Sequence, residues 1–415
     1  MKIKDIGHVV TGKTSSTEID EYYGGNIMFI SPSDLHGDYL IEESEKTITE
    51  EGLNSIETNS IGGLSVLTGC IGWDMGNIAM CNSRCATNQQ INTITRFNES
   101  IADPRYVYYW LKGKKDYLFS IASVTRTPIL SKSVFEDIDI PIPCLGLQKK
   151  VANLLSSIDE KIRINNKIND YLEEMAKTIY DYWFVQFDFP NENGKPYKSS
   201  GGKMVNSNGH IIPEGWTFCK VQDIISNICT GLNPRDNFKL GTGDIKYITV
   251  KNLTPNGTLD FTGCDTIDES ARTIVHNRSD IQIGDILFAS IAPLGRCYLI
   301  QSEPTDWDIN ESVFSIRANT DIITPAFLYL YFMSDAFIKH ATSSSTGSIF
   351  KGIRINTLLE TELCVPPLSV ILKFKERLAS IFPLKSKNYE EIQRLSNLRD
   401  WLLPMLMNGQ ATIED

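Results

Sequence analysis

The chain has 415 residues, of which 41% are hydrophobic and 22% charged, and its formal net charge is −11. This length allows two or three domains with cores of their own, and the composition excludes collagen-like and wholly disordered chains. The acidic balance argues against a general nucleic-acid coat, which normally carries a basic excess, so any contact with DNA has to be local.

No apolar run approaches the roughly 18 residues that a membrane span requires, and the opening sequence MKIKDIGHVV lacks the apolar core of a signal peptide. We therefore expect a cytoplasmic protein. Nine scattered cysteines predict reduced thiols rather than a disulfide framework. We expect no metal site, because Cys81 and Cys85 have no second pair at zinc-finger spacing.

Residues 1–142 alternate short apolar runs with turn residues, which predicts a first domain with a mixed sheet and few helices. Residues 27–30 and 91–94 indicate strands. Pro104 then opens a helix that extends to Leu111, because proline suits the first turn of a helix.

Residues 143–188 are predicted to form one long helix, because their apolar residues recur with an unbroken helical period. Five positions spaced seven apart define a seam like that of a coiled coil, and Ile168, Met175 and Tyr182 widen it. The seam residues are Val151, Ile158, Asn165, Leu172 and Ile179.

Residues 189–212 have the Asn, Gly, Ser and Pro content of a linker. Residues 213–367 then repeat the first domain at an offset that drifts only from 218 to 223 positions, which indicates a tandem duplication of whole domains. The matching features include Thr11-Gly12 with Thr230-Gly231, Asn88 with Asn310, and the helix at Pro104 with a helix at Pro325.

A second long helix is predicted for residues 368–408, followed by a tail at 409–415. If the two helices pack antiparallel, Asn165 and Asn388 fall at about the same level, whereas Pro383 opposes an ideal seam because proline kinks or breaks a helix. The alternative is two amphipathic helices that pack only on their own domains. The second seam, 223 positions after the first, consists of Phe374, Ile381, Asn388, Leu395 and Leu402.

The predicted fold is therefore α+β. It contains two similar mixed-sheet domains separated by two long antiparallel, coiled-coil-like helices, with a pseudo-two-fold internal duplication.

Residues 7–14, GHVVTGKT, match the phosphate-binding P-loop pattern. That chemistry needs a buried strand before the loop and a helix after it, and neither flank has this character. The second copy has Leu232-Asn233 where the first has Lys13-Thr14. We expect no nucleotide site and no catalytic residues, and a P-loop NTPase that uses Gly12-Lys13-Thr14 is the alternative hypothesis.

Polar loops in equivalent places of both domains carry hydroxyl, ammonium and guanidinium groups, which suit phosphate oxygens and purine edges. We predict DNA-binding residues on these loops, with a solvated turn as the alternative for each. The first domain contributes Lys13, Arg84, Arg126, Thr127 and Lys132, and the second contributes Arg235, Lys251, Asn252, Arg296, Ser345, Thr346, Ser348, Lys351 and Arg354.

Three motifs lie near the ends of the helices: DFP at 188–190 with GKPYK at 194–198, IPEGW at 212–216, and LRDWLLPML at 398–406. Together with the duplicated domains and helices, they make the whole chain resemble the specificity (S) subunit of type I restriction-modification enzymes. The resemblance implies that each domain is a target recognition domain for one half of a split DNA sequence, while the helices set the gap between the halves.

The resemblance also implies that two methyltransferase (M) subunits dock along the helices and that restriction (R) subunits join them. S-adenosylmethionine, ATP and Mg would then be bound by these partners, and this chain would be a non-catalytic subunit with no cofactor of its own. A scaffold of two protein-binding domains without a role on DNA is the remaining alternative, which the acidity of both domains favours.

Overall fold

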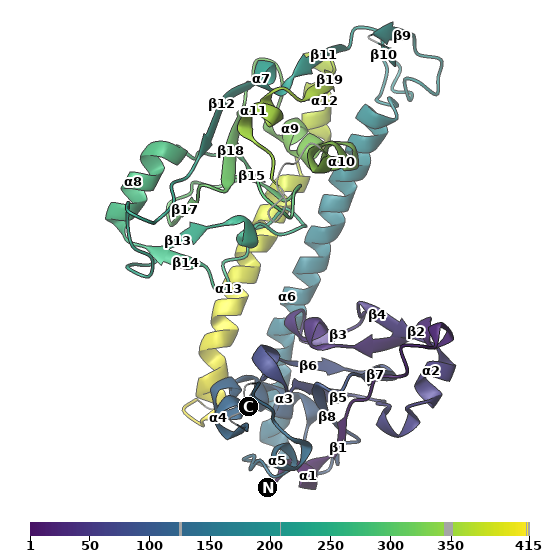
Figure 1. Ribbon diagram of the computed structural model, residues 1–415, viewed down its shortest axis with the longest axis vertical. Coiled ribbons are helices and arrows are strands. Elements are labelled where there is room, and N and C mark those ends of the chain that lie inside the picture. The colour runs from purple at the N-terminus through teal and green to yellow at the C-terminus, as the bar shows by residue number, and fades with distance from the viewer. Residues whose placement is uncertain (124–126, 208, 344–351, 412, 414–415) are drawn as a thin grey trace. The chain divides into compact units, whose positions relative to one another are not determined.

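The computed structural model describes residues 1–123, 127–207, 209–343, 352–411 and 413, and these form two compact units. Unit 1 comprises Met1–Asn166 and Glu390–Asp415, and unit 2 comprises Lys167–Tyr389. Each unit therefore holds one sheet domain and a stretch of both long helices (Figure 1). No helix in the described part of the chain combines the length and the apolarity that crossing a bilayer requires.

The first lobe, residues 1–142, contains a five-stranded sheet of order β1-β8-β5-β6-β3 and a three-stranded sheet of order β4-β2-β7. In the first sheet only β3 and β6 pair in parallel, and in the second sheet β2 is parallel to β7 and antiparallel to β4. The strands are β1 (His8–Thr11), β2 (Tyr23–Ile30), β3 (Leu40–Ile41), β4 (Lys46–Ile48), β5 (Ser65–Gly69), β6 (Ile78–Cys81), β7 (Cys85–Thr87) and β8 (Ile91–Thr95), and the helices are α1 (Ile3–Ile6), α2 (Glu50–Asn54), α3 (Pro104–Lys112), α4 (Lys115–Ile121) and α5 (Lys132–Glu136).

The five-stranded sheet is covered on both faces, so every residue of β5 and β8 is buried. Val66 belongs to the apolar cluster of α3, and its neighbour Leu67 belongs to the cluster that contains Ile30 of the second sheet. Helix α3 starts where the sequence predicts, because the Asp103 side chain accepts a hydrogen bond from the Arg105 N–H at 2.9 Å. The strands predicted at 27–30 and 91–94 are also confirmed.

The second lobe, residues 213–367, repeats this architecture and confirms the duplication. Its main sheet has the order β12-β18-β15-β16, and its second sheet, β14-β13-β17, again joins one antiparallel and one parallel pair. The elements are β11 (Thr217–Lys220), β12 (Ile225–Thr230), β13 (Ile245–Ile248), β14 (Asp265–Ile267), β15 (Ile286–Ala289), β16 (Cys297–Leu299), β17 (Trp307–Ile309), β18 (Val313–Ala318), β19 (Glu362–Val365), α7 (Val221–Ile224), α8 (Glu269–Ser279), α9 (Pro325–Phe332), α10 (Asp335–Ser343) and α11 (Ile355–Leu359).

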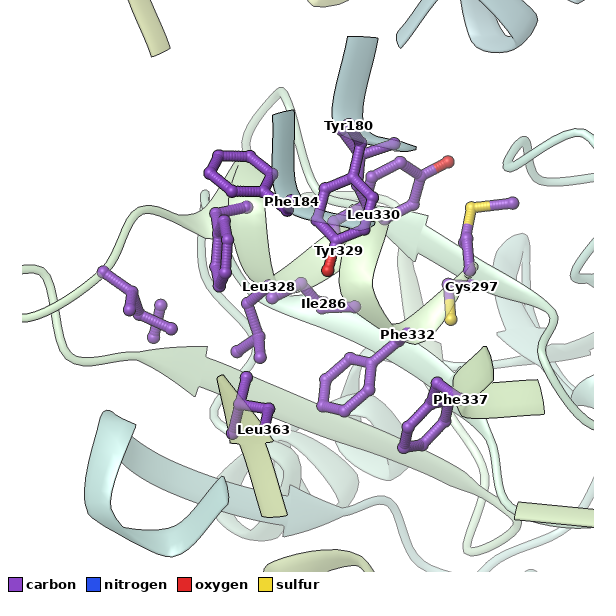
Figure 2. Close-up of a cluster of buried hydrophobic side chains, with 14 of the residues drawn as sticks. Tyr180, Phe184, Ile286, Cys297, Leu328, Tyr329, Leu330, Phe332, Phe337 and Leu363 are labelled. Carbon is purple, nitrogen blue, oxygen red and sulfur yellow. The ribbon is translucent and has the colours of Figure 1, made fainter. Parts of the chain in front are cut away.

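Helix α9, the counterpart of α3, lies between the main sheet and the first long helix. Figure 2 shows Tyr180, the last residue of that helix, and Phe184 in the π-helical turn after it beside Leu330 and Tyr329 of α9. The Phe184 ring also meets the Phe327 ring edge to face at a centroid distance of 4.9 Å. Aromatic packing therefore joins the second lobe to its helical support.

In each lobe the first residues pair with the last residues. In the second lobe β11 pairs antiparallel with β19. In the first lobe Lys2 forms a single bridge with Asp139, and the Ile140 N–H donates to the Met1 carbonyl at 2.8 Å. This shorter pairing takes the place of a strand pair.

Residues 189–212, predicted as a linker, are folded. They contain β9 (Met204–Ser207) and most of its hairpin partner β10 (His210–Pro213), and the Phe189 ring stacks on the Tyr197 ring at 4.6 Å. The glycines of this segment suggested a flexible linker, but they occupy tight turns of a folded segment, as at Gly209, where φ is +85°.

The long helices are α6 (Leu145–Tyr180), which continues into a π-helical turn at Asp181–Val185, and the pair α12 (Leu368–Arg377) and α13 (Ile381–Met407). The single helix predicted for 368–408 is therefore interrupted at residues 378–380. Pro383 lies in the first turn of α13, just after this interruption. In a continuous helix its ring would clash with the carbonyl of residue 379, which explains why the helix is broken there.

In each unit a stretch of α6 lies antiparallel to a stretch of α13 (Figure 1). In unit 1, Ile158 and Ile162 of α6 form a cluster with Ile392 and Leu395 of α13. Val151 lies in the core cluster of unit 1, where Leu402 packs against it, and Phe374 and Ile381 lie in that of unit 2, with Leu172 and Ile179 packed against it.

The predicted level of the seam asparagines is wrong by about one helical turn. The Asn165 side chain donates to the Glu391 carboxylate at 3.2 Å, and the Asn388 side chain donates to the Asn169 amide oxygen at 3.1 Å. Each amide therefore has a polar partner in its own unit, which satisfies a buried polar group without an Asn165–Asn388 pair.

A buried tyrosine, a carboxylate and a cation join the first lobe to both long helices. The Tyr109 hydroxyl on α3 donates to Asp159 on α6 at 2.6 Å, and Arg399 on α13 donates to the same carboxylate at 2.8 Å. Asp159 is only 3% exposed, so the Arg399 charge compensates a carboxylate that water does not reach.

Unit 2 contains the same combination of groups. The Tyr329 hydroxyl on α9 donates to Glu173 on α6 at 2.9 Å, and Lys385 on α13 forms an ion pair with Glu173 at 2.5 Å. Lys385 also donates to the carbonyls of Asn256 and Gly257. Burial lowers the pKa of Lys385, and the neighbouring Glu173 charge opposes this shift.

We predict that Lys385→Met lowers the free energy of unfolding of unit 2 by about 3 kcal/mol, because it leaves the Glu173 carboxylate buried without a counter-charge. Urea unfolding of the full chain would measure the loss. The control is Lys203→Met, which breaks the ion pair between Lys203 and Glu214. These two side chains are 68% and 53% exposed, so this substitution should change stability little. Equal effects of the two substitutions would contradict the prediction.

Candidate nucleic-acid interface

Antiparallel pairing brings the end of β1, the start of β8, the end of β5 and the start of β6 to one edge of the first lobe's main sheet. The loops at this edge, residues 12–14, 70–77, 88–90 and 127–130, form the first-lobe loop edge. Backbone hydrogen bonds connect them: the Cys70 N–H donates to the Gln90 carbonyl at 2.8 Å, and the Leu130 N–H donates to the Cys70 carbonyl at 2.9 Å.

The second lobe has an equivalent edge, which we define as the second-lobe loop edge: residues 231–237, 250–253, 290–296, 310–312 and 352–354. The Gly231 N–H donates to the Asn310 carbonyl at 3.2 Å, and the Ile353 N–H donates to the Ser290 carbonyl at 2.8 Å. The Arg296 guanidinium donates to the Leu253 carbonyl at 3.1 Å. Loops far apart in the sequence therefore meet at this edge too.

The repeated glycines and asparagines build both loop edges. A Cβ at Gly12 would lie 2.0 Å from the Asn88 carbonyl oxygen, and one at Gly231 would lie 1.7 Å from a carbonyl oxygen of Ile309. Asn88 and Asn310 each accept a hydrogen bond at their side-chain oxygen from the N–H two residues later, at 3.0 Å. Close approach of two backbones thus explains why Gly12 and Gly231 recur.

This geometry does not support the P-loop alternative. Residues 8–11 of the matching pattern form strand β1, and Thr14 is followed by irregular chain as far as the 3-10 turn at Asp20–Tyr22. A P-loop needs its strand before the glycine-rich segment and a helix directly after it.

Two of the residues predicted to bind DNA in the first lobe lie on its loop edge. Lys13 is exposed, and Thr127 borders the loop that contains Gly72. Arg84 lies instead in the turn between β6 and β7, at the opposite end of the strands, and pairs with Glu50 at 2.8 Å. Lys132 is the first residue of α5 and lies 3.5 Å from Glu136, and Arg126 is outside the described residues.

Four predicted residues of the second lobe share its loop edge: Arg235, Lys251, Arg296 and Arg354. Asn252 must be corrected to a structural residue, because it is buried, its side-chain oxygen accepts from the Thr249 N–H at 2.8 Å, and its amide donates to the Asp260 carbonyl at 2.8 Å. The predictions for Ser345, Thr346, Ser348 and Lys351 lie outside the described residues.

The sequence reasoning missed Trp73, which is 90% exposed on the first-lobe loop edge. Its loop is held by Asp74, which lies 2.8 Å from His36, and by Asn77, which accepts from Lys115 at 3.0 Å. A tryptophan between glycines in a turn joining two buried strands was the signal that could have identified it.

Burial raises the pKa of the Cys70 thiol to about 12, so this group stays protonated and donates to the Gln90 carbonyl at 3.1 Å. The Cys81 and Cys85 sulfurs lie 3.6 Å apart as free thiols. Within the described ranges, no three His, Cys, Asp or Glu side chains gather so that they could hold a metal ion. The chemistry of both loop edges is therefore that of hydrogen bonding, charge and one aromatic ring.

Comparison with known proteins assigns this architecture to one family. The family described as the type I restriction modification DNA specificity domain matches residues 1–174 and 213–394. The MjaIX specificity subunit of a type I restriction enzyme from Methanocaldococcus jannaschii is 26% identical over 424 residues, covering 100% of this chain and 93% of the relative. The HindI specificity subunit from Haemophilus influenzae is 22% identical, covering 75% of this chain and 78% of the relative.

A crystal structure of a type I restriction-modification S subunit from M. genitalium has the same fold. It aligns with a TM-score of 0.55 at 14% identity, over 98% of this chain and 95% of that one. The chain belongs to the type I restriction modification DNA specificity family and is a specificity subunit of such a system.

We predict that Asn252→Ala destabilises unit 2 by about 1 kcal/mol, because it removes the hydrogen bonds that this buried side chain makes to the Thr249 N–H and the Asp260 carbonyl. The matched control is Lys251→Ala, which truncates the exposed neighbouring side chain and should leave the melting temperature unchanged. Thermal unfolding followed by circular dichroism measures both. An Asn252→Ala variant of unchanged stability would return Asn252 to the DNA-contact candidates.

Proposed function

We propose that each lobe reads one half of a bipartite DNA target with its loop edge. The observation that carries this proposal is the repetition of the edge itself, with the same order of strands and the same glycine and asparagine turns in both lobes. Recognition through loops on a rigid sheet suits sequence readout, because loop side chains can vary while the strand ends stay in place.

The charges support DNA as the ligand of the second-lobe loop edge. Residues 216–366 carry 12 basic and 17 acidic side chains, whereas this edge holds four cations and only two carboxylates, Asp236 and Glu311. The first-lobe loop edge balances Lys13 against Asp74, in a lobe with 12 basic and 19 acidic residues over 1–140. The edges are thus the less acidic part of each lobe, and partner subunits would supply further positive surface.

We assign the covalent chemistry to partner subunits, so that this chain recognises DNA without catalysing a reaction. S-adenosylmethionine, ATP and Mg would be bound by methyltransferase (M) and restriction (R) subunits. In unit 2, α6 and its π-helical turn carry exposed apolar side chains at Ile168, Tyr171, Met175 and Tyr182, which supports docking of an M subunit on this face. The sequence pattern had instead assigned Ile168, Met175 and Tyr182 to the seam.

The long helices would set the gap between the two halves of the target. Helix α6 supports this role, because its 36 residues continue without interruption from unit 1 into unit 2. Helix α13 does the same in the opposite chain direction.

We predict that Arg354→Ala weakens recognition of one half-site only. In the complex reconstituted with M subunits, the variant should lose roughly tenfold in affinity for the intact target, because one charged contact is removed. Its discrimination against changes in the other half should stay unchanged. Lys13→Ala should do the same for the opposite half, and Lys203→Ala, outside both loop edges and paired with Glu214, serves as the control.

Equal loss of discrimination at both halves by Arg354→Ala, at unchanged thermal stability, would contradict the division of labour between the lobes. A wild-type complex that discriminates neither half would contradict the proposed function as a whole.

A second prediction concerns the helices. Removing residues 161–167 together with 390–396 deletes seven residues from each helix in matching register and shortens both by about 10 Å. The tolerated gap between the half-sites should then fall by about three base pairs, with both half-sites unchanged. Methylation of duplexes with graded gaps measures this. Deleting 161–167 alone is the control, since it misaligns the helices and should abolish activity.

A further inference from the structure

Trp73 is the most exposed large apolar side chain of the described chain, at 90%. An indole left in water does not gain the favourable free energy of burial that tryptophan gains in cores and interfaces. Single exposed leucines or isoleucines need no explanation, but a fully projected tryptophan on a candidate binding surface does.

The loop that carries Trp73 is rigidly attached. The Gly72 N–H donates to the Pro128 carbonyl at 3.0 Å and the Gly76 N–H donates to the Gly69 carbonyl at 2.9 Å, while Met75 is fully buried in the core. Both glycines have positive φ, +74° and +78°, so the backbone makes the two sharp bends that leave the indole outside. The backbone that presents the ring is therefore held in place before any ligand arrives.

The second lobe lacks this feature. Ile71 and Ile291 occupy equivalent positions, since Ile71 bridges Ile129 and Ile291 bridges Gly352. This alignment places Pro293 where the first lobe has Trp73, and the next residue, Leu294, packs against the core cluster of unit 2. The two loop edges thus share the arrangement of their strand ends, but of the two only the first carries an aromatic ring.

We propose that the Trp73 indole contacts the bases of the half-site read by the first lobe, and that it is a specificity-determining residue of that half-site alone. This inference rests on the proposed function. Aromatic rings bind nucleic acid by stacking on a base or by wedging into a base step, and both modes need an exposed ring. Lys13 and Thr127 on the same edge, with Lys115 beside the Trp73 loop, supply groups that suit the adjacent phosphates.

The test uses the complex reconstituted with methyltransferase subunits and three duplexes: the intact target, one altered in the first half and one altered in the second. Trp73→Ala should reduce affinity for the intact target roughly 10- to 100-fold, the range expected for loss of one base-stacking contact. It should abolish discrimination at one half and keep discrimination at the other. Trp73→Phe should retain most of both, because a smaller ring still stacks.

Ile274→Ala is the matched control, because it truncates an exposed apolar side chain on α8 of the second lobe, at 42% exposure, and should change nothing. Thermal unfolding should not distinguish Trp73→Ala from wild type, because so exposed a side chain contributes little to folding. Tryptophan emission should be quenched by the intact target in the wild-type complex and much less in the Trp73→Phe variant.

A Trp73→Ala complex that discriminates both halves as the wild type does would overturn the inference and leave the proposed function standing. Failure of Trp73→Ala to assemble with the methyltransferase subunits would also overturn it, because Trp73 would then be a protein contact. A wild-type complex that discriminates neither half would remove the proposed function and this inference together.

Discussion

Each lobe of this protein depends on a carboxylate that is buried between a lobe tyrosine and a cation of the other long helix. Asp159 has this role in unit 1 and Glu173 in unit 2. Because an uncompensated buried charge is so unfavourable, the buried carboxylate needs its cation beside it, and the tyrosine hydroxyl donates a further hydrogen bond to it. The contact therefore fixes where along the helices each lobe sits, which non-directional apolar packing does much less sharply.

The duplicated loop edges separate support from recognition. Gly12 and Gly231 are constrained by backbones that approach within van der Waals contact, and Asn88 and Asn310 by the turns that they stabilise. The side chains that project from these edges differ between the lobes, as Trp73 and Pro293 illustrate. The proposed reading of one half-site by each lobe, with the same fold, would use this combination of a shared frame and individual side chains.

Much of the fold could be predicted from the sequence, because strand patterns, the start of α3 at Pro104 and the duplication depend on local chemistry and self-similarity. The level at which Asn165 and Asn388 lie could not, because heptad spacing leaves the mutual shift of two helices open. The candidate site was predictable in residue type but not in place. Arg84 lies at the end of the strands opposite the loop edge, and this placement follows only from the order of the strands. The Asn252 side chain bonds to backbone groups near it in the sequence, and these bonds depend on the conformation of its turn.

The two buried triads have the same kinds of group but different residues. One pairs aspartate with arginine, and the other pairs the longer glutamate with lysine. A lobe exchanged by recombination at the junction between sheet and helix would leave its tyrosine facing a carboxylate of the wrong reach. Exchange of a lobe together with its helical stretches would preserve the match. A crossover within the helices therefore keeps each tyrosine of this chain with the carboxylate and cation that it contacts.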